Sequence, residues 1–197
     1  MDQVAAPFAQ NLATMQKDGE CLVSFIIGSL IYESRNNFAK QAMEVGADCV
    51  LWLDSDMTFP ADLLPRMHEH LEAGREIVSA ICFRRRPPFT PTIFKTLGIG
   101  EDGVGYHSPF DDYPRDSLFE VGGVGFGCIM TSRGVLEDMV LNYKQWFNPI
   151  AGFGEDLSFC IRAKELGYKL WCDSRLKCGH VGQLVVDEDV FLHTRDA

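Results

Sequence analysis

The sequence has 197 residues, of which 46% are hydrophobic, and this size suits a single globular domain over residues 1–197. The formal net charge of −10 argues against binding to duplex nucleic acid, whose phosphates need a basic face on the protein. No apolar run approaches the ~20 residues that span a bilayer, and the N-terminal stretch lacks a secretory pattern. Because the seven cysteines are scattered and odd in number, we expect reduced thiols and a cytoplasmic protein.

The first part of the sequence alternates helical and strand patterns. Apolar residues at helical spacing predict a helix that ends at Gly19, and a β-branched run predicts a strand over residues 21–27. Ser34 is placed to cap a second helix. The run over residues 49–53 is apolar on both faces, which is typical of a central strand covered by helices. A helix that begins near Pro60 follows.

Strand patterns dominate the middle of the sequence. Strands are expected over residues 76–83 and 91–95, whereas residues 98–117 are rich in Gly, Asp and Pro and are expected to form loops. The glycine-containing run over residues 118–132 is also typical of strands. Ser132 is placed to cap the helix that comes next.

The last part begins with a helix that starts at Glu155 and ends near Gly167. A strand over residues 169–173 leads toward His180, and residues 185–192 are expected to add an edge strand. This order of elements predicts an α/β fold with a mostly parallel mixed sheet flanked by helices. In such a sheet, ligands bind beyond the C-terminal ends of the strands.

Two acids follow the predicted buried strand in the stretch CVLWLDSDMTFP. Asp54 and Asp56 would lie at the ligand edge, where two neighbouring carboxylates repel each other unless a cation or a partner neutralises them. Their hard oxygen atoms suit Mg²⁺ or Mn²⁺ that carries a substrate diphosphate. The structural alternative is that both acids end the strand and cap the helix near Pro60.

The segment LWLDSDMTFP resembles the D-x-D segment of GT-A-type glycosyltransferases, especially the family 2-like proteins of bacteria and their phages. Three further motifs occur in the order of that family: Arg35-Asn36 before the D-x-D strand, Glu155-Asp156 at the start of the late helix, and His180 after the next strand. The resemblance covers about residues 20 to 182. It implies a single Rossmann-like GT-A domain that transfers a sugar from a nucleotide-sugar donor, with a UDP-sugar as first candidate, to an acceptor hydroxyl with inversion.

The resemblance also implies roles for individual residues. Asp56 would bind Mn²⁺ or Mg²⁺ directly, Asp54 would contact the donor and support the ion, and His180 would be a further ligand. Asp156 would be the general base that takes the proton of the acceptor hydroxyl, and Glu155 would hold the acceptor or orient that base. The alternative for His180 is an ordinary surface histidine. The alternative for Glu155 and Asp156 is that the helix dipole favours acids in a first turn whatever the function.

Other residues are expected to contact the donor or the acceptor. Arg35 would bind donor phosphate, with a surface ion pair as the alternative. Trp146 and Gly154 precede the late acids and would form a rim for a sugar face, although a core role fits the aromatic residues of this segment equally well. Gly123 lies in a run of glycines that would let a substrate approach the backbone, and close strand packing is the alternative.

The sequence departs from the family in one respect. GT-A domains usually begin with a strand that helps to hold the nucleotide base, whereas this sequence opens on a helix. We therefore expect that strand to be absent, which leaves the nucleotide specificity open. For the same reason, a non-catalytic module that binds nucleotide-sugars or glycans stays an alternative to the enzyme. The acceptor is not identified, and a homo-oligomer is left open.

Two other kinds of site share some of these residue types. A haloacid-dehalogenase-like phosphatase also has Asp-x-Asp after an apolar strand, with Thr58 at a suitable spacing, but the later acid pair of that class is missing. Zinc bound by Cys172, Cys178 and His180 would lack paired C-x-x-C spacing. The arginines at positions 84–86 are interpreted either as a solvated turn or as an anion contact.

Overall fold

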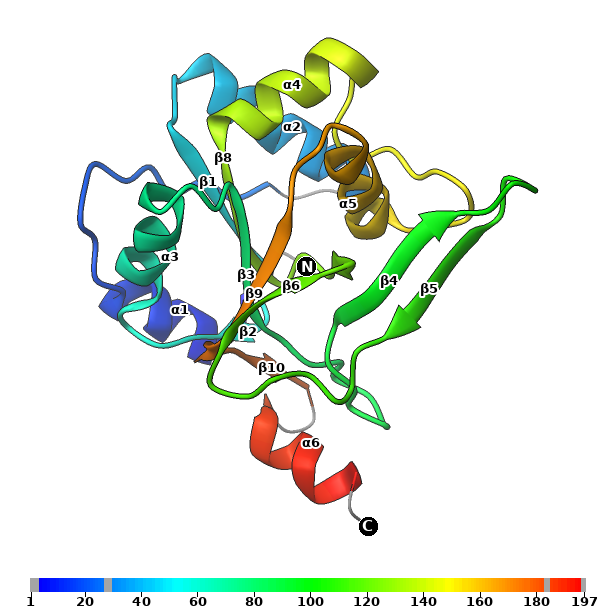
Figure 1. Cartoon of the computed structure of the whole chain (residues 1–197). Coiled ribbons are helices and arrows are strands. Elements are labelled where there is room, and N and C mark those ends of the chain that lie inside the picture. Colours follow the sequence, from blue (N-terminus) through cyan, green and yellow to red (C-terminus); the bar gives the residue numbers. More distant parts are fainter. Residues whose placement is uncertain (1–3, 27–29, 183–184, 196–197) are drawn as a thin grey trace.

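The computed structural model describes residues 4–26, 30–182 and 185–195. Within these residues, a five-stranded sheet has the order β1-β8-β3-β9-β6 (Figure 1). Its strands are β1 (Cys49–Leu53), β3 (Ile77–Ile81), β6 (Leu118–Val121), β8 (Cys128–Ser132) and β9 (Leu170–Lys177). The helices are α1 (Ala6–Thr14), α2 (Ile31–Glu44), α3 (Leu63–Glu72), α4 (Arg133–Tyr143), α5 (Glu155–Glu165) and α6 (Glu188–Arg195).

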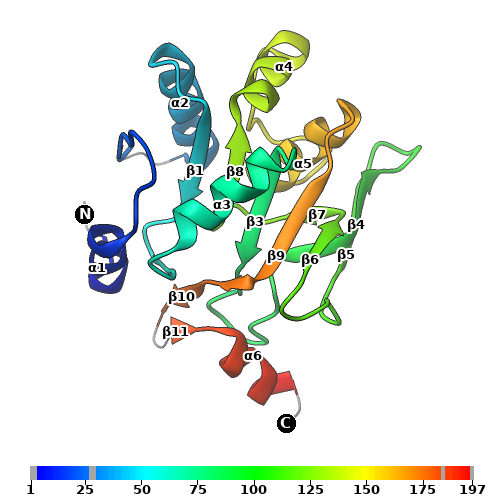
Figure 2. The same ribbon diagram turned by 60° about the vertical axis from the view of Figure 1, so that its left-hand side comes forward.

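The sheet separates two apolar cores. Helices α1 and α3 cover one face, and α2, α4 and α5 cover the other (Figure 1 and Figure 2). Successive residues of β3 alternate between the faces, since Ile77 belongs to the core that includes α4 and α5, and Val78 belongs to the core that includes α3. A sheet covered on both faces needs apolar strands, which explains the unbroken hydrophobic run before Asp54.

The predicted α/β class is confirmed, but the sheet is less parallel than expected. In the described part of the chain, β3 and β9 form the one parallel pair of this sheet, and β8 lies antiparallel between β1 and β3. Strands β1, β3 and β9 still run in the same direction, so their C-terminal ends meet at one edge. The direction of β8 depends on pairing with strands that are distant in sequence, which no local pattern reports.

Two small sheets lie beside the central one. Their strands are β2 (Met57–Thr58), β4 (Ile93–Ile99), β5 (Gly105–Pro109), β7 (Gly123–Val124), β10 (Gly179–Val181) and β11 (Val185–Val186). In one sheet β10 pairs with β2 and β11, and in the other β4 pairs with β5 and β7. Strand β5 corrects the prediction of loops over residues 98–117. The polar composition there marks the tight connection between β4 and β5, where Val104 N donates to Asp102 Oδ1 (3.0 Å).

The strand predicted over residues 21–27 is wrong for residues 21–26, which form neither helix nor strand. Residue 27 lies outside the described residues. Leu22 is 76% exposed, so this apolar run lacks the packing partners that stabilise a strand. Among the residues that the structure describes, β1 is the first strand.

The observed helix ends test the capping residues and helix stops that the sequence predicted. Helix α1 ends at Thr14, before Gly19, where the sequence predicted its end. Helix α2 begins at Ile31, so Ser34 does not cap it, and Ser34 Oγ instead donates to the Leu30 carbonyl (3.3 Å). Ser132 caps α4 as predicted, because its side chain accepts from the backbone N–H of the third residue after it.

The C-terminal segment corrects the edge strand predicted over residues 185–192. Its first two residues form β11, and α6 then begins at Glu188. Asp187 explains the change, because its Oδ1 accepts from Val190 N (3.0 Å) as the start of a helix requires. Across the described ranges, no helix is both long and apolar enough to cross a membrane.

Candidate active site

Asp54 and Asp56 lie in the turn between β1 and β2, at the C-terminal end of β1. Asp54 N donates to the Gly127 carbonyl (3.0 Å), and Met57 N donates to the Asp54 carbonyl (3.1 Å). This turn brings both carboxylates out of the covered sheet, as the sequence predicted. The N-cap residue of α3 is Asp62, so the alternative that Asp54 and Asp56 cap this helix is wrong.

Arg35 of α2 connects the two acid motifs. Its side chain is 8% exposed, and its Nη2 lies 2.9 Å from Asp54 Oδ1. Its Nε lies 3.4 Å from Glu155 Oε1. Both terminal nitrogens lie 3.4 Å from the Phe126 carbonyl oxygen. Arg35 is thus a buried cross-link rather than the surface ion pair considered above, and its contact with donor phosphate stays a prediction.

Asn36, next to this arginine, holds the segment that leads to the late acids. Its Oδ1 accepts from Trp146 N (3.2 Å) and Phe147 N (2.9 Å), and its Nδ2 donates to Asn148 Oδ1 (2.7 Å). The Trp146 indole N–H donates to the Leu136 carbonyl (2.8 Å), and the ring lies in the core. The rim that was expected to stack on a sugar is therefore not formed by Trp146, because its ring is committed to packing.

The glycines predicted to contact substrate differ in what surrounds them. A Cβ added to Gly123 would lie 2.6 Å from the Leu97 side chain, so close strand packing accounts for this glycine. Gly154 is the N-cap residue of α5, and a Cβ there would lie 3.3 Å from Asp156 Oδ1. A Cβ at Gly125 would lie 3.6 Å from Asp156 Oδ2. Gly125 and Gly154 therefore leave room around the Asp156 carboxylate.

His180 reaches Asp56 because β10 pairs with β2. Its Nε2 lies 3.2 Å from Asp56 Oδ2, and its Nδ1 lies 2.8 Å from the Phe83 carbonyl oxygen. A carbonyl oxygen can only accept, so Nδ1 carries a proton and Nε2 is the nitrogen that faces the acid. The hydrogen bond with Asp56 raises the pKa of His180, although burial opposes this shift.

Arg85 is a second partner of the same carboxylate. Its Nη1 lies 2.7 Å from Asp56 Oδ2. Partial burial on its own would raise the pKa of Asp56, but the hydrogen bond and charge of His180 and the charge of Arg85 together lower it. A hollow of about 360 Å³ beside this pair is lined by Arg84, Arg85, Arg86, Pro87, Thr92 and His180.

Asp54 and Asp156 differ from Asp56, because their pKa values are raised rather than lowered. Burial raises the pKa of Asp54 and the charge of Asp56 adds to the shift, while Arg35 offsets part of it. Burial also raises the pKa of Asp156, and the neighbouring charge of Glu155 adds to it, although Asp156 Oδ1 accepts from its own helix. A carboxylate with a raised pKa is a stronger base, which suits a group that must accept a proton.

A divalent cation needs ligands that converge on one point. Within residues 4–26, 30–182 and 185–195, no group of three or more His, Cys, Asp and Glu side chains is arranged to hold a metal ion. This rules out the zinc site of Cys172, Cys178 and His180 among these residues. Asp56 and His180 remain as a carboxylate and an imidazole whose Nδ1 is held by a carbonyl, which leaves Nε2 for an ion. Such a pair fits Mg²⁺ or Mn²⁺, because these ions commonly take few protein ligands and complete their shell with water and substrate phosphate.

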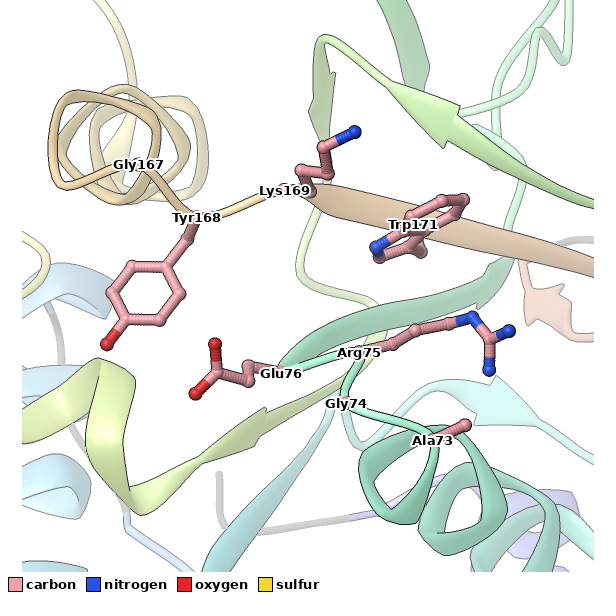
Figure 3. Close-up of a pocket in the computed structure, with 8 residues that line it drawn as sticks. All are labelled: Ala73, Gly74, Arg75, Glu76, Gly167, Tyr168, Lys169 and Trp171. Atoms are coloured by element: carbon pink, nitrogen blue, oxygen red, sulfur yellow. The ribbon is translucent and has the colours of Figure 1, made fainter.

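Another hollow, of about 380 Å³, lies at the opposite edge of the sheet, where β3 and β9 begin (Figure 3). Figure 3 shows Tyr168 and Glu76 on one side of it and Trp171 with Arg75 on the other. The residues that line it are Ala73, Gly74, Arg75, Glu76, Gly167, Tyr168, Lys169 and Trp171. None of the predicted site residues is among them.

Comparison with known families identifies the class of protein. The family described as glycosyl transferase family 2 matches residues 23–140. Because this is more than half of the chain, the chain belongs to glycosyl transferase family 2. The match contains Arg35 and the D-x-D acids and ends before Asp156 and His180. It excludes the haloacid-dehalogenase-like phosphatase. No curated protein sequence matches the chain.

Solved structures share the fold. A197 from STIV aligns with a TM-score of 0.69 and 17% sequence identity, over 96% of this chain and 86% of that chain. GalNAc-T7, solved with UDP, GalNAc and Mn²⁺, aligns with a TM-score of 0.53 and 10% identity, over 85% of this chain and 34% of that chain. At these identities the likeness shows the fold alone, which is a mixed α/β domain of the GT-A type.

Proposed function

We propose that the chain transfers a sugar from a nucleotide-sugar, with a UDP-sugar as first candidate, to an acceptor hydroxyl, with inversion and with Mn²⁺ or Mg²⁺. The observation that supports this most is the Arg35 cross-link, which holds Asp54 of the D-x-D motif and Glu155 of the late acid pair around one guanidinium. Groups suited to a diphosphate and groups suited to an acceptor proton therefore share one edge of the sheet. The UDP and Mn²⁺ in GalNAc-T7, which has the same fold, agree with this choice.

Asp56 and His180 would hold the divalent cation. When bound, such an ion neutralises the charge that grows on a leaving diphosphate. His180 Nδ1 stays bonded to the Phe83 carbonyl, which keeps the ring oriented with Nε2 toward the carboxylate. Asp54, whose carboxylate is paired with Arg35, would contact the donor. The main negative charge at the ion would come from Asp56.

Asp156 would be the general base. Its Oδ1 is fixed by the N–H of Leu157 (2.7 Å), while the glycine at position 125 leaves space next to Oδ2. Oδ2 would accept the proton of the acceptor hydroxyl as that oxygen attacks the anomeric carbon opposite the leaving diphosphate, so the anomeric configuration inverts. Glu155, paired with Arg35, would keep the first turn of α5 in place.

Arg35 is assigned as a positioning residue. Its guanidinium is buried and meets acids of both motifs, so it fixes their separation without needing to touch the transferred sugar. Arg35 also packs over the Phe126 ring, with 5.1 Å between Cζ and the ring centroid, and this contact holds the cation at the centre of the site.

Donor binding is tested by thermal shift with a panel of UDP-sugars, each with and without Mn²⁺. A donor that binds only the folded chain raises Tm, and we expect the largest rise when ion and donor are both present. Asp56→Ala should remove the Mn²⁺-dependent part of the rise, whereas Asp112→Ala, at an exposed loop acid, should keep it. An undiminished Mn²⁺-dependent rise in Asp56→Ala would contradict the metal assignment.

A second candidate, the non-catalytic binding module, is favoured by one observation. No strand precedes β1 in the part of the chain that the structure describes, so the base-holding strand of the family is not seen there. Such a module would show the same donor-dependent rise in Tm without releasing UDP. Measuring Mn²⁺-dependent UDP release from the donors that bind therefore separates the two candidates.

Compartment, assembly and acceptor remain predictions. All seven cysteines are free, which agrees with the expected reducing cytoplasm. The net charge of −10 favours a glycan, lipid-linked or protein hydroxyl over duplex nucleic acid as the acceptor. A homo-oligomer stays open.

A further inference from the structure

The loop between β3 and β4 presents three arginines, at positions 84–86, from a fixed base. Arg84 N donates to the Thr90 carbonyl (2.9 Å), and Thr92 N donates to the Cys82 carbonyl (2.9 Å). The three arginine side chains beyond these bonds are exposed. The loop therefore has an ordered attachment to the sheet and a cationic tip.

Arg85 extends from this loop to the acid assigned to the divalent ion. Its Nη1 lies 2.7 Å from Asp56 Oδ2, which is also the oxygen that His180 Nε2 approaches at 3.2 Å. The Arg85 side chain is 53% exposed and that of Asp56 is 30% exposed. Because solvent reaches both groups, this ion pair is weak and can open without disturbing the core.

A divalent ion at Asp56 would meet the Arg85 guanidinium at the same oxygen atom. Two cations that share one carboxylate oxygen repel each other, so the ion and Arg85 compete for Asp56. Within the described residues, neither Arg84 nor Arg86 forms an ion pair with an acid. Arg85 is thus the arginine of this loop whose position is coupled to the metal-binding carboxylate.

The diphosphate of a bound donor would be a stronger partner for Arg85 than the Asp56 carboxylate. A guanidinium can bind two phosphate oxygens with parallel hydrogen bonds, which makes phosphate a better partner than a single carboxylate oxygen. The hollow of about 360 Å³ next to Arg85 is lined by the other two arginines and His180. In a chain of net charge −10, this cluster is suited to an anion rather than to a cation alone.

We propose that Arg85 holds the Asp56 carboxylate until the donor arrives and then moves to the donor diphosphate as the divalent ion takes its place at Asp56. The proposal rests on the proposed function in one respect, since it takes Asp56 as a ligand of the ion. It makes ion and donor bind cooperatively, because the donor withdraws the cation that competes with the ion, and this coupling is the same in both directions.

The test measures Mn²⁺ binding from the electron paramagnetic resonance signal of the free ion, without and with UDP. Without UDP, Arg85→Gln should bind Mn²⁺ about three- to fivefold more tightly than the wild type, which is the range that release of an exposed ion pair allows. With Mn²⁺ saturating, Arg85→Gln should bind UDP about fivefold more weakly. Arg86→Gln removes the same charge from the same loop, at an arginine that does not contact Asp56, and should bind Mn²⁺ without UDP as the wild type does.

The outcomes separate this inference from the proposed function. If Arg85→Gln and Arg86→Gln tighten Mn²⁺ binding equally, net charge accounts for the effect and the inference is wrong. It is also wrong if Arg85→Gln leaves Mn²⁺ affinity unchanged while Asp56→Asn abolishes binding, although the metal site then stands. If Asp56→Asn binds Mn²⁺ as well as the wild type, or if no variant binds it, the metal assignment fails and the inference fails with it.

Discussion

Asp173 on β9 and two acids of the candidate site, Asp54 and Asp156, have opposite electrostatic settings. The Asp173 side chain is 1% exposed, and its carboxylate accepts from His70 Nε2 (2.9 Å) and from the Arg175 guanidinium (2.8 Å). Burial opposes ionisation of this acid, but these bonds outweigh it and lower its pKa. Asp54 and Asp156 receive less compensation for their burial, and their pKa values are raised.

The difference separates an acid that stabilises the fold from acids that cost stability. A buried carboxylate that is fully hydrogen-bonded supports the native state, whereas an under-compensated one is retained where chemistry needs it. Replacing the acid by its amide should therefore have opposite consequences in the two regions: lost activity with an intact fold at Asp156, and a weakened fold with intact chemistry at Asp173.

The largest effect is expected for Asp156→Asn. Removal of a general base should lower the rate of sugar transfer by about 10²- to 10⁴-fold, while Mn²⁺-dependent donor binding is kept. Because an amide costs less to bury than an under-compensated carboxylate, Tm should not fall. Transfer rate, donor affinity and Tm are measured together, with Asp112→Asn as the control at an exposed acid. Full activity in Asp156→Asn would end its assignment as the base.

Asp173→Asn should weaken the fold instead. The substitution leaves His70 and Arg175 without their carboxylate, and we expect a loss of about 3 kcal/mol in the free energy of unfolding. For a domain of this size, this corresponds to a fall in Tm of roughly 10 °C. Thermal unfolding measures the loss, and the transfer rate per folded molecule should equal that of the wild type. A stable but inactive Asp173→Asn would contradict the division between the two regions.

Gly125→Ala should give a smaller loss of activity. The added Cβ would lie 3.1 Å from Thr92 Cβ and 3.6 Å from Asp156 Oδ2, so it narrows the space next to the proposed base. We expect roughly a tenfold decrease in transfer rate from this displacement. The matched control is Gly134→Ala on α4, where the nearest atom to the new Cβ lies 3.7 Å away. Equal rates for Gly125→Ala and the control would show that this space is not used.

Lowering the pH should separate activity from stability. Asp156 acts only when ionised, and since its pKa is raised, kcat should begin to fall at a pH above the ordinary aspartate value of about 3.9. The groups that act on Asp156 are Glu155, which raises its pKa, and Arg35 and the Leu157 N–H, which lower it. Asp173 has a lowered pKa, so its contribution to stability is present above about 3.9 and is lost only as pH falls through its folded-state pKa.

The pH dependence of kcat is measured with donor and Mn²⁺ saturating, so that loss of the ion does not contribute, and Tm is followed in parallel. Activity should decline at a higher pH than Tm does. Activity and Tm that decline together would mean that unfolding, rather than protonation of Asp156, stops the reaction.

The sequence predicted the parts of the fold that depend on local pattern. The run over residues 49–53 is apolar on both faces because the sheet is covered on both faces, and the helix from Glu155 has acids in its first turn and bases in its last. The direction of β8 depends on pairing between distant segments, so it was missed. The hairpin of β4 and β5 is local, but β5 was missed because the Gly, Asp and Pro content of residues 98–117 is typical of loops. Residues 21–26 show the reverse case, since a suitable local pattern found no partner strand.

Motif order predicted which acids and which histidine of the candidate site lie together, but not their contacts. In the structure, the pairing of β10 with β2 places His180 Nε2 3.2 Å from Asp56 Oδ2. The sequence could not show that Arg35 points inward between two acids, or that Trp146 turns into the core, because charged and aromatic side chains suit both surface and interior positions. The Arg85 contact with Asp56 was also invisible, since a loop that returns to the sheet edge has no periodic pattern.

The most direct test of the account follows the fate of a donor that binds. The chain is incubated with that UDP-sugar and Mn²⁺, with water or a simple sugar as acceptor, and the first product is observed by proton NMR before mutarotation. We predict Mn²⁺-dependent release of UDP and a product whose anomeric configuration is inverted relative to the donor. A product with retained configuration, or no UDP release from a donor that binds with Mn²⁺, would contradict it.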